Sequence, residues 1–480
     1  MKYLVTLIKE MQLRDTLFFS GYALYLAFSY MALHSATVLS SGGGLDFDTQ
    51  TLFLIAVISA RVVAFMAIAL IARYTKTNLV KILPALAGAT AVAGFLVLGM
   101  SLQFASRLPA DMLRSWLMLG GVLLGFGDVA ITLLWARFSA TLTLRSVYLY
   151  VVLCNGVSLV VYFIVTLLPG ETGVPVAAAL FLLSVIAAKK SLDRRRLQQW
   201  EYSSPVFVHA LRSVSQPILG TAVLYFMSGL MLQISGQRDI PLAFSQQTAL
   251  LTSAIVVVCL LLPALLVKKP FNIGRMYAVA LPLSAAGFLL LPLVWNAAGG
   301  IVNSFAQLGS MVAAIILWCM LAGMSRDTEL PSALLFSIAF ASINAALLAG
   351  TLVGFLYSET LRQSDIVLTA VTLVAAYLLF MAALFLFKDK SLKNIGSEAE
   401  LPAIRPEAHV PQQCERIADS HQFTPRERDI FALLAQGFTI PAISEKLFVS
   451  ENTVKSHVKS IYQKMGIHTR SELIEQVNAQ

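Results

Sequence analysis

The stretch SENTVKSHVKSIYQKMG, Ser450–Gly466, has the pattern of one amphipathic helix that starts after a short turn. Ser450 is suited to the N-cap, because a serine hydroxyl accepts a hydrogen bond from a free backbone N–H of the first turn. At 100° per residue, one side of the helix is a narrow apolar stripe and the other is polar and basic. The apolar stripe consists of Val454, Val458, Ile461 and Met465. The polar side consists of Asn452, Lys455, Ser456, Lys459 and Gln463. The helix is therefore expected to pack through one face and to leave the other free for a polar partner.

Three further helices are predicted around this one. TPRE, Thr424–Glu427, is a capping box with proline at the first helical position, and it opens a helix that Gly437 ends. IPAISEKLF forms the second helix and buries Ile443 and Leu447, one turn apart. TRSE, at 469–472, is a second capping box and opens the fourth helix. The apolar positions of that helix are Leu473, Ile474 and Val477.

These motifs, TPRE, SENTVKSHVK and TRSEL, resemble the LuxR-type, GerE-like helix-turn-helix family of bacterial transcription regulators over about Phe423 to Val477. The resemblance implies a four-helix domain that binds double-stranded DNA as a homodimer, with the third helix in the major groove. Together with the exposed polar face, it gives one set of candidate DNA-binding residues. They are Asn452, Thr453, Lys455, Ser456, His457, Lys459 and Gln463.

The resemblance also assigns roles within this set. Lys455, Ser456 and Lys459 would face bases and nearby phosphates, Thr453 and His457 would touch the DNA backbone, and the fourth helix would form the dimer contact. Basic and short polar side chains suit these tasks, because ammonium groups bind phosphates and guanine edges and short side chains permit close approach.

Two positions depart from the family pattern. Ile440 stands where the family commonly has Asn, and Ser444 where it commonly has Ala, but neither is on the predicted reading face. A protein-interaction module is the alternative, because seven Lys or Arg nearly balance six Asp or Glu from His421 onward. Lys455, Lys459 and Lys464 all lie on one helix, and this concentration of charge favours DNA.

The rest of the chain has a different composition. Of the 480 residues 58% are hydrophobic and 13% are charged, whereas charged residues make up roughly 25% of a soluble domain. Apolar runs long enough to cross a bilayer predict a polytopic, all-α membrane domain of twelve helices. The spans run approximately over Thr16–Leu39, Thr51–Ala72, Val80–Leu102, Met112–Phe138, Ser146–Leu168, Gly173–Ala188, Pro217–Ser235, Gln246–Val267, Arg275–Trp295, Ile301–Met324, Ala333–Tyr357 and Ile366–Phe387.

The distribution of Lys and Arg predicts the orientation of these spans. Most of the basic residues fall in the loops on the side of the N-terminus, which places both termini in the cytoplasm of a bacterial inner membrane. The basic residues on the opposite side are Arg107, Arg114, Arg238 and Arg362.

The longest internal connection, 189–216, divides the spans six and six. This layout resembles the major facilitator superfamily, in which two six-helix bundles enclose a central cavity. The resemblance is one of layout over residues 1–388. A Gly and Asp-containing signature that the family often carries after its second span is missing, because that loop reads ARYTKTNLVK.

Residues 389–420 are rich in charges and prolines and are expected to form a flexible cytoplasmic linker. The predicted domains are thus a membrane domain, 1–388, this linker, and a DNA-binding domain, 421–480. The four cysteines occur singly, and no metal site, cofactor site or catalytic constellation is recognisable, so an enzyme is not expected.

Polar residues at depth in the membrane are candidates for a ligand site. Arg61 and Asp128 are predicted at equal depth, so they can pair, either as a permanent clamp between two helices or as part of a sensor. Asn155, Gln307 and Asn344 are the other candidates, with interhelical hydrogen bonds as the plainer alternative. Two hypotheses follow: a one-component regulator whose bundle senses an unknown small molecule, or a secondary transporter that carries a regulatory DNA-binding tail.

Overall fold

The computed structural model describes most of the first half of the chain and selected parts of the second. The described residues are 16–34, 39, 45–74, 79–193, 204–236, 250–251, 253–261, 309–326, 328, 330–357, 373–374, 377, 410–435, 438, 440, 443–444, 447, 449–467, 472–473 and 476–477.

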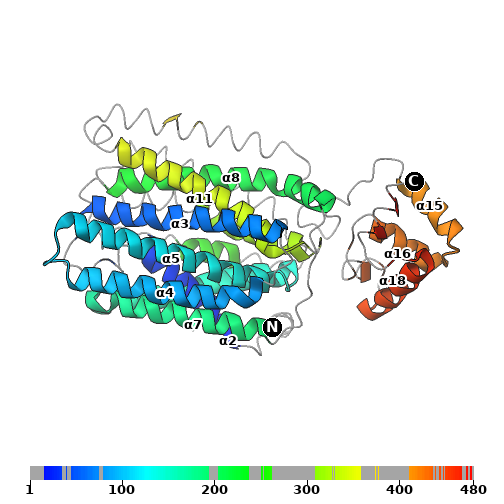
Figure 1. The fold of residues 1–480 in the computed structure, drawn as a ribbon, viewed down its shortest axis with the longest axis horizontal. Coiled ribbons are helices and arrows are strands. Elements are labelled where there is room, and N and C mark those ends of the chain that lie inside the picture. The colour runs from blue at the N-terminus through cyan, green and yellow to red at the C-terminus, as the bar shows by residue number, and fades with distance from the viewer. Residues whose placement is uncertain are drawn as a thin grey trace.

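The described residues form an all-α membrane bundle and a smaller helical domain (Figure 1). Helices are the expected outcome, because an apolar run in lipid must satisfy its backbone N–H and C=O groups within itself. Eight helices are long and apolar enough to cross a membrane within the described part of the chain. The helices of the bundle are α2 Thr16–Ser29, α3 Phe47–Tyr74, α4 Leu79–Gln103, α5 Ala110–Ser139, α6 Leu144–Thr166, α7 Gly173–Asp193, α8 Ser204–Gly236, the helix Gly309–Arg326, and α11 Ser332–Leu356.

Where the structure describes them, the predicted spans correspond to these helices, with shifts of a few residues at most ends and two larger differences. The first span continues beyond α2 only as a π-helical turn, Tyr30–His34. Helix α8 starts at Ser204, well before the predicted Pro217, so the end of the connection 189–216 is helical. The start of α8 could not be recognised from the sequence, because Pro217 and the polar residues before it have the composition of a loop. The predicted span Gln246–Val267 is described only at residues 250–251 and 253–261. The predicted span Arg275–Trp295 and nearly all of Ile366–Phe387 lie outside the described residues.

Neighbouring helices contact one another in the order α8, α11, α3, α5, α4, α7 and α2, as Figure 1 shows from α8 at the top to α2 at the bottom. Helix α11, from the second half of the chain, therefore packs against α3 from the first half. Glycines allow the closest approaches: a Cβ on Gly125 would lie 2.6 Å from the carbonyl oxygen of Val57, and one on Gly350 would collide with the carbonyl oxygen of Phe226. Small residues at such crossings are typical of helix pairs in membranes.

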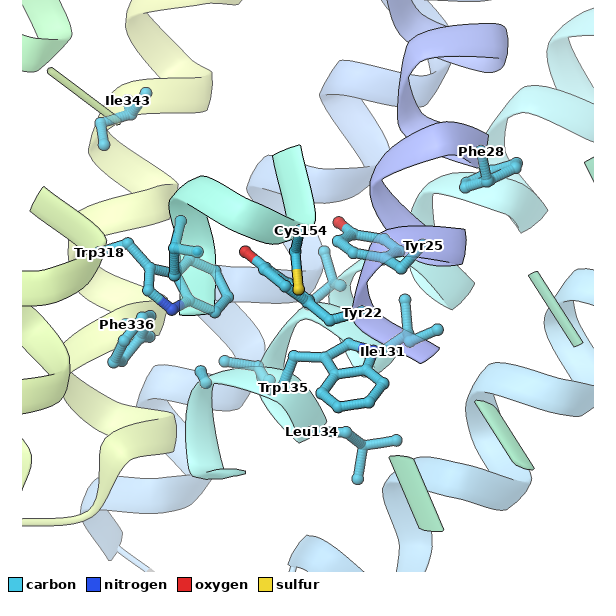
Figure 2. Packing of buried hydrophobic residues seen from close by; sticks show 14 of the residues in the cluster. Tyr22, Tyr25, Phe28, Ile131, Leu134, Trp135, Cys154, Trp318, Phe336 and Ile343 are labelled. Atoms are coloured by element: carbon cyan, nitrogen blue, oxygen red, sulfur yellow. The ribbon is translucent and has the colours of Figure 1, made fainter. Parts of the chain in front are cut away.

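An aromatic cluster joins the two halves at the centre of the bundle (Figure 2). The ring of Tyr22 lies 5.6 Å from Trp135, 5.5 Å from Tyr150 and 5.6 Å from Trp318. The indole N–H of Trp318 donates to the hydroxyl of Ser139 at 3.0 Å, so the buried polar atom of the ring is satisfied. Trp318 comes from the second half of the chain, whereas Tyr22 and Ser139, which it contacts, come from the first. These contacts therefore hold the two halves together.

The outer surface of the bundle is apolar. On α3, for example, Val63, Met66 and Leu70 are more than half exposed and lie along one side of the helix. Such a surface is suited to lipid and not to water, because monomeric soluble proteins rarely expose large contiguous apolar patches.

The smaller domain contains α15 Val410–Ser420, α16 Pro425–Ala435 and α18 Glu451–Met465. Helix α15 corrects the predicted linker 389–420. Cys414, Ile417 and Ala418 are buried in the same core as α16 and α18, so the folded domain begins near Val410 and not at 421. The apolar positions are too few for a membrane span, and the prolines and charges around them gave the segment the composition of a linker.

Glu427 connects the two main helices of this domain. Its carboxylate accepts hydrogen bonds from the Thr424 backbone N–H at 2.8 Å and from the Ser460 hydroxyl at 2.6 Å, and it pairs with the Lys464 ammonium at 2.7 Å. The Thr424 hydroxyl in turn accepts from the Glu427 N–H at 3.3 Å, which confirms the predicted capping box. Burial alone would raise the pKa of Glu427, but the bonds from Lys464, Ser460 and Thr424 outweigh it and lower that pKa to about 2.

We expect Gly350→Ala to lower the thermal stability of the purified full chain by about 1–3 kcal/mol, because the methyl group has no room at the crossing of α8 and α11. The matched control is Gly88→Ala on α4, where an added Cβ meets nothing within 4 Å. The measurement is thermal unfolding in detergent. Equal unfolding temperatures for the two variants would show that this crossing is not tight.

Glu427→Gln should reduce the free energy of unfolding of residues 410–480 at pH 7 by about 1–3 kcal/mol, because it removes a hydrogen-bonded ion pair. The folded-state pKa of Glu427 is lowered, so its contribution is fully present above its ordinary value of 4.5 and is lost as the pH falls towards about 2. The difference between wild type and Glu427→Gln should therefore shrink over that range in urea titrations. Glu415→Gln, at an exposed position on α15, is the control. A difference that does not change between pH 5 and the acid limit would contradict the assignment.

Candidate functional site

Helix α18 is capped at both ends as its sequence predicts. The Ser450 hydroxyl accepts from the Thr453 backbone N–H at 3.1 Å, which confirms Ser450 as the N-cap. Gly466 ends the helix in the left-handed conformation with φ 69°, which glycine adopts without strain. The caps fix where the helix begins and ends, and thus which side chains face outward.

The outward face carries the predicted DNA-binding residues. Val454, Val458, Ile461 and Met465 are buried against the domain core, so the polar side of α18 faces away from it. His457 is half-buried at the edge of this face. The exposed members of the set are Asn452, Thr453, Lys455, Ser456, Lys459 and Gln463.

Two lysines of α18 differ in whether their ammonium groups are free to bind a partner such as DNA. Lys455 is 3.9 Å from Glu451 and both side chains are more than half exposed, so this ion pair is weak and leaves the ammonium accessible. Lys464 contacts Glu427 and the carbonyl oxygen of Gln422 at 3.2 Å. Lys464 therefore holds α18 on the domain and does not add to the free charge of the reading face, contrary to the count made from the sequence.

The fourth helix is described only at residues 472–473 and 476–477. Leu473 is fully buried and Val477 is 2% exposed, both within the domain's own core. On the same segment Gln476 is exposed, so the predicted dimer contact of the fourth helix involves its outward positions and not Leu473, and the contact itself stays a prediction.

A second site lies inside the membrane bundle. A cavity of about 220 Å³ is lined by residues from α2, α3, α5 and α6 of the first half and from α8, the helix Gly309–Arg326 and α11 of the second. Its walls combine aromatic rings, aliphatic side chains and hydroxyl groups. The aromatic lining residues are Tyr22, Tyr25, Tyr30, Tyr225, Trp318 and Phe340.

Arg61 and Asp128 meet at the wall of this cavity. Arg61 Nε lies 3.0 Å from Asp128 Oδ2, and the side chains are 12% and 2% exposed. The Tyr25 hydroxyl donates to Asp128 Oδ1 at 3.0 Å and lies 2.7 Å from the Thr132 hydroxyl. Arg61 lines the cavity and Asp128 lies behind it. Removing one partner of a buried pair leaves an uncompensated charge, at a cost of about 3–5 kcal/mol.

The other intramembrane candidates are placed differently. Asn155 lines the cavity, but its amide N–H donates to the carbonyl oxygen of Val151 at 2.8 Å within its own helix. Asn344 donates in the same way to Phe340 at 2.7 Å and does not line the cavity. The side-chain amides of Asn155 and Asn344 therefore donate to carbonyl oxygens of their own helices and do not link two helices. Gln307 lies outside the described residues.

Sequence reasoning missed Tyr25, Thr132 and the aromatic walls. A tyrosine in the middle of a predicted span is a polar group at depth, and this signal could have added Tyr25 to the candidates, since a buried tyrosine hydroxyl usually finds a partner. The dual role of Glu427 was also missed, because the capping box already explained that residue.

Comparisons with known proteins find relatives of the C-terminal domain and solved structures that resemble the membrane part. Residues 421–477 match the family described as bacterial regulatory proteins, luxR family. The chain is 48% identical over 54 residues to the nitrate/nitrite response regulator protein NarL of Escherichia coli K12, and this match covers 11% of the chain and 25% of NarL. It is 43% identical over 51 residues to the spore germination protein GerE of Bacillus subtilis, covering 11% of the chain and 69% of GerE. The chain thus spans about a quarter of NarL, and the match is confined to the DNA-binding domain.

Solved structures resemble the membrane part in fold. A bacterial homologue of the iron transporter ferroportin, in an outward-facing state, aligns with a TM-score of 0.54 and 16% identity over 78% of this chain and 99% of its own. The human organic anion transporter MFSD10 aligns with a TM-score of 0.52 and 15% identity over 78% and 98%. At this identity the likeness concerns the fold alone. Through its capped helix α18 and the match over residues 421–477, the chain belongs to the luxR family of bacterial regulatory proteins, with a transmembrane domain of transporter-like fold in front of the DNA-binding domain.

Proposed function

We propose that the protein is a membrane-bound, one-component transcription regulator that senses a small molecule through its bundle and binds promoter DNA through α18. The observation that carries the proposal is the exposed polar face of α18, on a helix that Glu427 and Lys464 fix to its domain. The role is one of binding and regulation, not of catalysis.

The arrangement in the cell forms part of the same proposal. Residues 1–388 form twelve spans, six on each side of the connection 189–216, in the bacterial inner membrane. The excess of Lys and Arg on the N-terminal side supports cytoplasmic termini, which the DNA-binding role requires. Residues 389–409 connect the bundle to the domain that begins with α15.

A transporter with a regulatory tail is the second candidate, and the fold likeness to transporters favours it. The two candidates differ in what the cavity does: a sensor needs only to bind its ligand, whereas a transporter must release it on the other side. Uptake into vesicles that contain the purified chain separates them, because a pure sensor accumulates no ligand.

Lys455→Ala and Lys459→Ala should each weaken DNA binding by residues 410–480. A lost base contact costs about 1–3 kcal/mol, and a lost phosphate contact lowers the slope of log affinity against log salt by about one. Gel-shift titrations at several salt concentrations measure both, on a duplex that the wild-type domain selects from a random-sequence library. The control is Arg416→Ala, which removes one exposed charge from α15. Equal losses in all three variants would mean that only the total charge matters and that α18 is not the reading helix.

We further propose a homodimer on DNA, in which two copies of α18 enter successive major grooves. The near balance of charge in the domain supports this, because one copy has few free cations with which to hold a duplex. The selected duplexes should contain two half-sites about 10 base pairs apart. Protection of a single half-site at saturating protein would argue for a monomer.

A further inference from the structure

The cavity in the bundle has an apolar lining with polar groups set into it. Aromatic rings from both halves and aliphatic side chains form the apolar part, and hydroxyl groups lie among them. Of the described residues that line it, Arg61 alone carries a full charge. The hydroxyl-bearing serines are Ser29, Ser228, Ser253 and Ser310. These surroundings suit a ligand with a flat apolar body and one polar end, because aromatic faces accept rings by stacking and hydroxyls accept or donate hydrogen bonds.

The charge that faces the cavity is positive. Asp128 cannot supply a negative one, because Oδ2 contacts Arg61, Oδ1 accepts from Tyr25, and the side chain is 2% exposed. Arg61 Nε contacts Asp128 Oδ2 at 3.0 Å as an ion pair without hydrogen-bond geometry, and no described residue accepts a hydrogen bond from the two terminal nitrogens of Arg61. A guanidinium in this state has donors left for a second anion, and it binds a carboxylate best through two parallel N–H groups.

The size of the cavity limits the ligand. Pockets for drug-sized molecules have volumes of about 300–1,000 Å³, whereas this cavity has about 220 Å³. A single ring with a carboxylate fits this volume better than a fused or multi-ring molecule.

We propose that the cavity binds a small aromatic carboxylate, whose carboxylate takes the terminal nitrogens of Arg61 in competition with Asp128 and whose ring lies against the aromatic walls. This inference rests on the proposed function, because it names the class of molecule to which the regulator responds. A cationic ligand would be repelled by Arg61, because no described negative group faces the cavity. A neutral ligand would leave the N–H donors of Arg61 without an acceptor in a site that holds little water.

Such a ligand would act on both halves of the bundle. Arg61 on α3 and Asp128 on α5 hold two helices of the first half together, and Trp318 and Phe340 belong to the second half. A carboxylate that draws Arg61 from Asp128 weakens the link between α3 and α5, while its ring adds contacts between the halves. The ligand then favours one arrangement of the halves by its differential affinity for it, which is what a regulatory signal requires.

The test uses the purified full chain in detergent and three probes of one shape: benzoate, benzamide and benzylamine. Each is titrated to about 10 mM while thermal unfolding is followed by tryptophan fluorescence, because a ligand that binds only the folded state raises the unfolding temperature with concentration. Benzoate should bind at least about tenfold more tightly than the neutral and cationic probes. Equal shifts with all three, a preference for benzylamine, or no shift with benzoate would overturn the proposal.

Two variants test the residues. Arg61→Gln should abolish the preference for benzoate, and Asp128→Asn should strengthen benzoate binding, because an amide competes less well for the guanidinium. The control is Arg114→Gln, which removes an arginine charge that does not line the cavity. Unchanged or weaker benzoate binding in Asp128→Asn would exclude the competition, and retained preference in Arg61→Gln would exclude Arg61. If Arg61→Gln does not fold, the Asp128→Asn variant and the comparison of the three probes still test the proposed ligand class.

The two proposals fail separately. Loss of charge selectivity would overturn the ligand class but leave DNA binding by α18 untouched, since the gel-shift titrations use residues 410–480 alone. Absence of DNA binding would overturn the proposed function as a transcription regulator, while benzoate binding would still stand as a property of the bundle.

Discussion

The contact between Arg61 and Asp128 is the constraint on which the membrane part depends. Either charge alone in the bilayer would be costly, so α3 and α5 must turn their polar positions towards each other and away from lipid. That rotation places Gly125 against Val57, where the helices approach closely, and turns Val63, Met66 and Leu70 outward. One pair of opposite charges thus determines which faces of two otherwise uniformly apolar helices are inside.

The same pair explains why a cavity forms beside it. Behind the wall, Asp128 Oδ1 accepts a hydrogen bond from Tyr25 and Oδ2 forms an ion pair with Arg61, and Arg61 also lines the cavity. Beside this point Tyr22 stacks on Tyr150 and lies against Trp318, and aromatic and aliphatic side chains together line the space. The polar group and the space therefore arise from one arrangement, which also joins the two halves through Trp318.

Much of this could be predicted from the sequence, and the failures have physical causes. Helix caps depend on neighbouring residues, so Ser450 and the pair Thr424 and Glu427 were predicted correctly. The pairing of Arg61 and Asp128 followed from depth, which depends only on position within an apolar run. Tyr25 was missed because its partnership depends on the rotation of α2, and helices that are apolar on all sides carry no periodic signal for rotation.

The errors in the smaller domain have a related cause. Lys464 was grouped with Lys455 and Lys459 as charge that favours DNA, because nothing in the local pattern shows that the Glu427 carboxylate both caps its own helix and pairs with Lys464. The burial of Leu473 in the core of its own domain is likewise a contact with residues far away in the sequence. Long-range contacts of this kind are not encoded in the spacing of residues along one helix.

The position of a DNA-binding domain at the end of a membrane protein can now be given a physical reason. The domain is small and almost neutral in charge, and Lys464 is used internally, so a single free copy is expected to bind DNA weakly. Anchoring to a bundle confines copies to a surface, which raises the effective concentration of one domain near another without any new contact. A change in how bundles associate would then alter the local concentration of paired domains steeply, while the affinity of each domain for DNA stays the same. For the proposed membrane regulator, weak binding by one copy would be useful, because it would leave the bundle in control of when two copies act together.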